Sequence, residues 1–204
     1  MQKFKILKLI YITLIINIIN SNEACAQADD RYYPFYIFPE SKTILLSGVI
    51  GTRAVLNFQR ALEAAPNTEI LLVNSNGGAV HNALIIAREA HRRNIKTFIP
   101  SDAECYSACS LIFFGGTSRK VDGLLGVHQI SSSDPNPEAD QLTISDIIEV
   151  LNEFNTPPEV LVPMFRTPPS DMYIFSTSEL ASMGLNSGDK PSPLPENSTP
   201  IGIL

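Results

Sequence analysis

The chain has 204 residues, of which 44% are hydrophobic and 18% are charged, and this is enough for one domain with a hydrophobic core. The composition excludes collagen-like chains, long coiled coils and wholly disordered proteins. The 15 Lys and Arg residues are outnumbered by 21 Asp and Glu residues, which gives a formal net charge of −6. Because phosphate contacts supply most of the affinity for nucleic acid, we do not expect an acidic chain without a clustered basic face to bind it.

The first residues have the three parts of a secretory signal. Lysines at positions 3, 5 and 8 precede an apolar run over 9–19, and alanines follow at positions 24, 26 and 28. This order predicts a signal peptide, residues 1–26, with cleavage after Ala26 or Ala28 and export to the periplasm or out of the cell. The apolar run is shorter than the stretch of about 20 residues that a membrane-spanning helix needs. An uncleaved membrane anchor is the alternative.

The predicted folded domain, residues 27–186, begins with alternating strands and helices. After an aromatic edge segment at 31–40, apolar runs predict buried strands, and periodic segments between them predict helices. The strands are expected at 43–51, 69–75 and 94–100, the helices at 53–64, 79–93 and 104–114, and further short strands at 120–130. This alternation is typical of an α/β fold with a mostly parallel sheet and crossover helices. Strands that are apolar throughout favour a sheet covered on both faces.

The composition changes after His128. Residues 129–141 are polar and contain prolines, which predicts a loop that serves as a lid or a subunit contact. An amphipathic helix is expected at 142–154, a short helix within 155–165 and a helical turn at 178–183. Residues 187–204 are rich in proline and serine, which predicts a flexible tail.

Two glycines follow the second predicted strand. Gly77 and Gly78 come directly before a predicted helix, and in parallel α/β sheets ligands bind beyond the carboxyl ends of the strands. Glycine lets the backbone approach a substrate closely and turn its N–H groups outward, as an oxyanion hole or a phosphate cradle requires. The sequence lacks the spacings of dinucleotide-binding and P-loop motifs, which argues against both. An ordinary turn from strand to helix is the alternative.

Cys105 and Cys109 flank a single serine, Ser107. Once a signal peptide that carries Cys25 is removed, the two cysteines are an even pair in an oxidising compartment. On a helix, positions four apart place the Cα atoms about 6 Å from each other, within the range of a disulfide. We therefore expect a disulfide that fixes the backbone around Ser107, with two reduced, packed thiols as the alternative. Two cysteines alone do not form a tetrahedral metal site, and we expect no metal.

Ser107 opens a predicted helix after a strand and a loop, and His128 follows an apolar strand 21 residues later. A serine in this place often only caps the helix, and a lone histidine after an apolar strand is often a core residue. A nucleophilic serine needs a base within hydrogen-bond reach and a third group that orients the base. The two residues are candidates for catalysis if the fold brings them together.

Five segments, taken in order, resemble the proteolytic subunit of the Clp protease, in the Clp/crotonase superfamily, and more closely its secreted periplasmic relatives. They are NSNGGAVHNALIIA at 74–87, CYSAC at 105–109, a G-x-x-R segment at 116–119, GVHQ at 126–129 and IFSTSELASMGL at 174–185. The resemblance covers about residues 43–186. It implies a Clp/crotonase-like spiral of ββα units with a mostly parallel sheet and flanking helices.

The resemblance also implies a catalytic triad. Ser107 matches the nucleophile of the family, and His128 matches its general base. Asp171 is the nearby carboxylate for the third member, but it lies one position away from the family's aspartate. The match therefore needs a small insertion within residues 171–175.

In the same family the oxyanion is bound by backbone N–H groups. Here these groups would be those of Gly77 or Gly78 and of Ala108, the residue after the serine. No cofactor takes part in such a mechanism, and none is expected.

The implied function is that of an exported serine peptidase, which cleaves peptide or protein substrates by acyl transfer. ATP is absent outside the cytoplasm, so the family's ATP-driven unfoldase is not expected as a partner. A homo-oligomer formed through the helix at 142–154 stays open. Two other functions also stay open. One is a non-catalytic binding or assembly module, since a fold does not imply a function. The other is a crotonase-type acyl-CoA enzyme, in which the two N–H groups polarise a thioester.

The signal-peptide prediction is tested by intact mass. We expect protein recovered from an exporting host to lack its first 26 or 28 residues, because the small residues before each bond are those that signal peptidases accept. A control variant with Ala26→Arg and Ala28→Arg should keep its N-terminal segment. Wild-type protein that retains Met1 after export would contradict the prediction.

Overall fold

The computed structural model describes residues 31–131, 136–186, 188–192, 194 and 200–201 of the chain. The predicted signal peptide, residues 1–26, lies outside the described residues. Within the described ranges, no helix is both long enough and apolar enough to cross a membrane. The described residues include most of the predicted domain and part of the segment that follows it.

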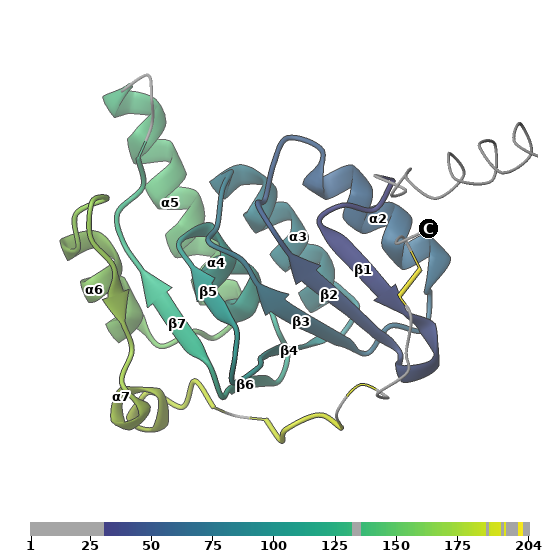
Figure 1. The fold of residues 1–204 in the computed structure, drawn as a ribbon. Helices are drawn as coiled ribbons and strands as arrows, with labels where there is room; N and C mark the ends of the chain where they lie inside the picture. Colours follow the sequence, from purple (N-terminus) through teal and green to yellow (C-terminus); the bar gives the residue numbers. More distant parts are fainter. Residues whose placement is uncertain (1–30, 132–135, 187, 193, 195–199, 202–204) are drawn as a thin grey trace, which may run out of the picture.

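Five strands form the main sheet, in the order β1-β2-β3-β4-β6 (Figure 1). They are β1 (Phe35–Phe38), β2 (Thr43–Ser47), β3 (Ile70–Asn74), β4 (Lys96–Ile99) and β6 (Arg119–Val121). The first two are antiparallel and are joined by a short 3-10 turn, η1 (Pro39–Ser41), whereas β2, β3, β4 and β6 run parallel to one another. The three buried strands predicted from the apolar runs are confirmed as β2, β3 and β4, each shorter than predicted.

A second, smaller sheet lies beside the first, in the order β5-β7-β8. Its strands are β5 (Glu104–Tyr106), β7 (Leu124–Val127) and β8 (Tyr173–Ile174). Two isolated parallel bridges, Ser75 with Cys105 and Ile50 with Gly78, extend this pairing to the segments that follow β3 and β2. The chain therefore repeats one unit: a strand of the main sheet, then a strand or bridge of the smaller sheet, then a helix.

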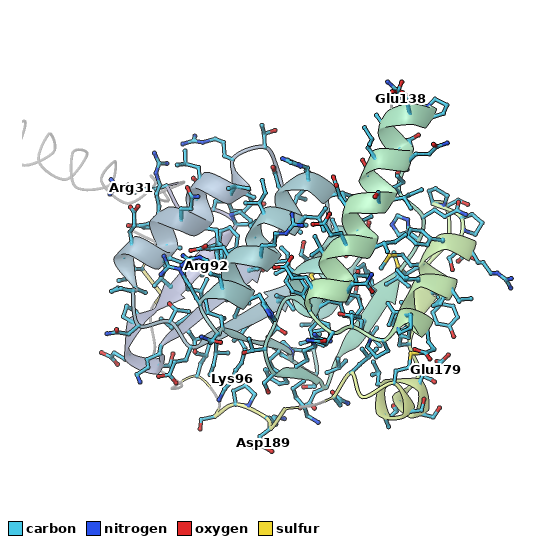
Figure 2. All side chains as sticks on the ribbon, turned by 180° about the vertical axis from the view of Figure 1, so that it is seen from behind. Arg31, Arg92, Lys96, Glu138, Glu179 and Asp189 are labelled. Carbon is cyan, nitrogen blue, oxygen red and sulfur yellow. A yellow bond between two sulfur atoms is a disulfide. The ribbon has the colours of Figure 1, made fainter. Side chains whose placement is uncertain are left out.

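Four helices cover one face of the main sheet (Figures 1 and 2). They are α2 (Ala54–Ala64), α3 (Val80–Arg92), α4 (Ala108–Phe114) and α5 (Pro137–Glu153). Ile44, Leu46, Leu71 and Val73 share this face of the sheet and are fully buried. The predicted fold class, an α/β fold with a mostly parallel sheet and flanking helices, is confirmed. Among the described residues, helices cover only this face, whereas on the opposite face Leu72 and Phe98 are buried without a covering helix.

The opposite face of the main sheet is contacted by residues near the C-terminus. Leu194 shares an apolar pocket with Leu72 and Phe98. Ile201 forms an antiparallel bridge with Ile37, at the outer strand of the sheet. The described residues of the predicted flexible tail, 187–204, thus include several that are bonded to the body.

The helix predicted at 104–114 begins later than predicted. Residues 104–106 form β5, and only the residues from Ala108 onward are helical. Ser107 separates the two elements, because its φ of +54° is incompatible with a right-handed helix. β5 pairs with β7, so its backbone groups are bonded in a sheet rather than within a helix.

α5 begins at residue 137, earlier than the predicted start at 142. The side chain of Asn136 accepts hydrogen bonds from the N–H groups of Glu138 and Ala139, and Pro137 occupies the first turn. Figure 2 shows the first turns of α5, marked by Glu138, projecting beyond the body. Of the loop predicted at 129–141, residues 137–141 are helical and 132–135 lie outside the described residues. Its role as a lid or subunit contact stays a prediction.

The short helices near the C-terminus agree with those predicted from the sequence. A 3-10 turn, η2 (Pro158–Val160), leads into α6 (Leu161–Arg166), and α7 (Thr177–Ser182) follows β8. Ser176 and Glu179 form a capping box at the start of α7, each side chain bonding to the backbone of the other. Both helices lie where the sequence predicts them.

Arg119 connects three parts of the fold from a buried position. Its Nε donates to the Gly116 carbonyl at 3.1 Å, and a terminal guanidinium nitrogen donates to the Phe154 carbonyl at 2.5 Å. Burial lowers the pKa of Arg119 to about 10. The side chain therefore stays charged at neutral pH and ties β6 to the end of α4 and the end of α5.

Replacing this arginine should destabilise the domain. Arg119→Met removes charge-assisted hydrogen bonds from buried carbonyl groups, so we expect a loss of about 3 kcal/mol in the free energy of unfolding. Chemical denaturation followed by circular dichroism measures it. The control is Arg53→Met, at an exposed arginine, for which we expect a change of at most about 0.5 kcal/mol. Equal stability of the two variants would contradict the anchoring role of Arg119.

Candidate active site

Ser107 lies in a sharp turn between β5 and α4 and has an unusual backbone. Its φ is +54° and its ψ is −126°, a conformation that residues with a side chain rarely adopt. The Ser107 N–H donates to the Gly126 carbonyl of β7 at 3.1 Å. The Ser107 carbonyl accepts from both the N–H and the hydroxyl of Ser110, at 2.9 and 2.7 Å. These bonds hold a conformation that costs of order 1–3 kcal/mol, and such residues cluster at functional sites.

A disulfide joins the two sides of this turn. Cys105 on β5 and Cys109 on α4 are bonded, with their Cα atoms 5.2 Å apart, and both are fully buried. The predicted disulfide is confirmed, but the geometry behind the prediction was wrong, because the pair spans a strand-to-helix turn rather than one turn of helix. The bond fixes the segment before Ser107 to the segment after it. We call residues 105–109 the Ser107 turn.

Gly77 and Gly78 pass close to the Ser107 turn in conformations that favour glycine. Their φ angles are +99° and +141°. A Cβ on Gly77 would lie 2.9 Å from both the Ser107 Cβ and the Ala108 nitrogen, and one on Gly78 would lie 2.4 Å from the Ile50 carbonyl oxygen. The two glycines therefore pack closely against Ser107 on one side and Ile50 on the other, and their approach to a substrate stays a prediction.

The N–H groups of the two glycines differ in their hydrogen bonding. The Gly77 N–H donates to the hydroxyl of Ser75 at 3.1 Å, so it is already bonded within the loop. Ile50 bonds to the Gly77 carbonyl and to the Ala79 N–H. In a parallel bridge of this kind the N–H of the middle residue, here Gly78, points to the opposite side, away from Ile50.

Of the three predicted oxyanion donors, two therefore have free N–H groups. Ala108 is the first residue of α4, where the helix itself provides no acceptor. Neither the Gly78 N–H nor the Ala108 N–H has a hydrogen-bond acceptor among the described residues. Gly77 needs a correction, since Ser75 occupies its N–H. Gly78, Ala108 and Ser107 line the same pocket.

Ser75 is a structural residue of the site that the sequence analysis missed. Its buried hydroxyl accepts the Gly77 N–H and donates to the Gly48 carbonyl. A serine two residues before a glycine is a common turn-forming arrangement, and this was the available signal.

His128 follows β7 and lines the same pocket as Ser107. Its Nδ1 lies 2.6 Å from the carbonyl oxygen of Gln129. A carbonyl can only accept a hydrogen bond, so Nδ1 carries the proton and Nε2 is left as an acceptor. No hydrogen bond joins the Ser107 hydroxyl to either ring nitrogen among the described residues. Hydrogen bonds of catalytic groups are often long in unliganded sites and shorten when substrate binds.

The pocket between these residues is small and is lined by both polar and apolar side chains. Its volume is about 60 Å³. The polar side chains are those of Ser107, Ser110, His128, Gln129 and Ser131. The apolar side chains come from α3, α4, α5, α6 and the segment after β7, and they are Val80, Leu111, Ile147, Met164 and Ile130.

Asp171 does not reach this pocket. It is exposed, and its Oδ1 accepts the N–H of Met172 at 2.8 Å. It forms neither a hydrogen bond nor an ion pair with His128, whose Nδ1 is bonded to Gln129. The structure therefore does not bring together the third member that the family resemblance implies. The described residues also contain no group of three or more His, Cys, Asp or Glu side chains placed to hold a metal ion.

The comparisons with known proteins agree with this architecture. No protein-family model matches the sequence, and no curated protein matches it. Among solved structures, the fold is similar to that of a mutant of a protein described as the 1510-N membrane-bound stomatin-specific protease. The two chains share 16% sequence identity with a TM-score of 0.52, over 70% of this chain and 75% of that chain. At this identity the likeness shows the fold alone, an α/β fold that a protease also has.

A methyl group on Gly77 should disturb the site. Gly77→Ala places a Cβ against Ser107 at a φ that alanine disfavours, so we expect a loss of about 2–4 kcal/mol in the free energy of unfolding. Gly51→Ala is the matched control, because a Cβ there meets nothing within 4 Å. Both are measured by urea denaturation. If Gly77→Ala is as stable as Gly51→Ala, the close packing of Gly77 on the Ser107 turn is disproved.

Proposed function

We propose that the protein is a serine peptidase in which Ser107 is the nucleophile and His128 the general base. The observation that carries this proposal is the strained backbone of Ser107 beside two free N–H groups, those of Gly78 and Ala108. Strain of this kind is stabilised here by a disulfide and by several hydrogen bonds. A serine that only caps a helix needs neither the strain nor the free donors.

The proposed reaction is acyl transfer. The Ser107 hydroxyl attacks the carbonyl carbon of a peptide bond, and its proton moves to Nε2 of His128. The carbonyl oxygen becomes an oxyanion, which the N–H groups of Gly78 and Ala108 bind. The imidazolium then gives its proton to the leaving amine. Water then attacks the acyl-enzyme while His128, again as the base, takes its proton, and the acyl group leaves Ser107 as the carboxylic acid product.

The proposed substrates are peptides or proteins. The apolar residues that line the pocket favour an apolar side chain of the substrate, and no cofactor takes part in the reaction. We place the activity outside the cytoplasm because of the predicted signal peptide and the disulfide, which is typical of oxidising compartments. ATP is absent there, so the proposal includes no ATP-driven partner. A homo-oligomer is compatible with it.

A non-catalytic binding or assembly module is the second candidate. It is favoured by the missing hydrogen bond between Ser107 and His128 and by the position of Asp171, away from the imidazole. Such a module would keep the fold and the pocket without the chemistry. A reagent that reacts only with an activated serine separates the two candidates.

Covalent labelling by a fluorophosphonate tests the proposed function. We expect wild-type protein to gain one adduct by intact mass, and peptide mapping to locate it at Ser107, because the oxyanion donors and His128 activate that hydroxyl. Ser107→Ala should gain none. Ser101→Ala, at an exposed serine after β4, is the control that should label like the wild type. Wild-type protein that stays unlabelled, or labels elsewhere, would favour the binding module.

A further inference from the structure

Gln129 has an unusual set of contacts for a residue next to a catalytic histidine. Its side-chain nitrogen donates to the Phe165 carbonyl at 2.7 Å, and its backbone N–H donates to the Thr167 carbonyl at 2.9 Å. Both acceptors lie at the end of α6. Its own carbonyl accepts the Nδ1–H of His128 at 2.6 Å. Gln129 is thus fixed on one side by α6 and holds the imidazole on the other.

The end of α6 is itself well anchored. The N–H and the hydroxyl of Thr167 both donate to the Pro163 carbonyl, at 3.0 and 2.8 Å. Met164 of the same helix is buried and lines the pocket. The orientation of the Gln129 carbonyl is therefore set by a packed helix rather than by a free loop.

We infer that Gln129 is a positioning residue, whose carbonyl performs the orienting function that a carboxylate performs in a catalytic triad. It holds His128 in the tautomer with the proton on Nδ1, which leaves Nε2 free to accept the Ser107 proton. The catalytic part of this inference, that the orientation of His128 serves proton transfer from Ser107, rests on the proposed function. It assigns no catalytic role to Asp171, which is exposed and bonded to the backbone of its neighbour.

The geometry favours Gln129 over Asp171 for a simple reason. An imidazole has one Nδ1–H, and that N–H already has a short, local acceptor. For Asp171 to take its place, the Gln129 carbonyl would have to turn away, and the two bonds from Gln129 to α6 oppose that rotation. Asp171 would also have to leave the N–H of Met172.

The test compares two variants with the wild type. Gln129→Met keeps the length of the side chain and removes its bond to α6, and Asp171→Asn removes only the charge. We expect Gln129→Met to slow fluorophosphonate labelling of Ser107 by about 10- to 100-fold, which is part of the roughly 10²–10⁴-fold that general base catalysis contributes. Asp171→Asn should change it by less than about 3-fold, as is usual for exposed positions. Gln59→Met, at an exposed glutamine of α2, is the control for the substitution itself.

The tautomer is read directly from the ¹⁵N shifts of the imidazole nitrogens, with His128 assigned through His128→Gln. We expect Nδ1 to be protonated in the wild type and in Asp171→Asn, and the two tautomers to mix in Gln129→Met. A merely structural role of Gln129 would alter stability without altering this spectrum. Protonated Nε2 in the wild type would overturn the inference, as would slower labelling in Asp171→Asn than in Gln129→Met.

The spectrum also separates the inference from the proposed function. If the wild type is not labelled at all but shows the Nδ1–H tautomer, and Gln129→Met loses it, the peptidase proposal fails and the positioning role of Gln129 is supported. If the wild type is labelled at Ser107 and the spectrum is unchanged in Gln129→Met, the peptidase proposal holds and the inference about Gln129 is wrong.

Discussion

Ser107 has a backbone conformation that its own side chain disfavours, and the geometry of the candidate site depends on the contacts that hold it. A φ of +54° turns the chain sharply from β5 into α4. The turn places the Ser107 side chain and the Ala108 N–H beside one pocket. In a regular helix starting at residue 104, Ala108 would bond to the preceding turn and its N–H would not be free. The disulfide between Cys105 and Cys109 prevents the two flanks from separating.

The smaller sheet explains why the glycines and the histidine come to the same place. Apart from β8, each of its strands or bridges follows a strand of the main sheet and precedes a helix. Ile50 is bridged to Gly78, Ser75 is bridged to Cys105, and β5, which contains Cys105, pairs with β7. Gly78, Ser107 and His128 each come shortly after one of these paired segments. Residues far apart in the sequence are therefore neighbours, because the ββα unit is repeated in register.

The helices and strands could be predicted from the sequence more accurately than the local backbone geometry of the site could. Apolar runs such as the one at 69–75 identify strands because burial alone determines them. The Ser107 turn was predicted as helix, since ECYSACSLIFF has no proline or glycine to mark a break. The strain at Ser107 is imposed by tertiary contacts, to Gly126 and Gly77, that no local pattern contains. The early start of α5 was missed for another reason: prolines suggested a loop, whereas Asn136 and Pro137 form a helix start.

The partner of His128 could not be predicted from residue types, because it is a main-chain carbonyl. In the proposed mechanism the difference between a carbonyl and a carboxylate is one of charge. Both fix the tautomer, but only a carboxylate adds a full negative charge that stabilises the imidazolium formed when Ser107 loses its proton. A carbonyl dipole supplies less of this stabilisation, so the site relies more on the oxyanion donors Gly78 and Ala108. This is why the rigidity of the Ser107 turn matters: N–H groups that are held in place contribute most when the developing charge has fewer other partners.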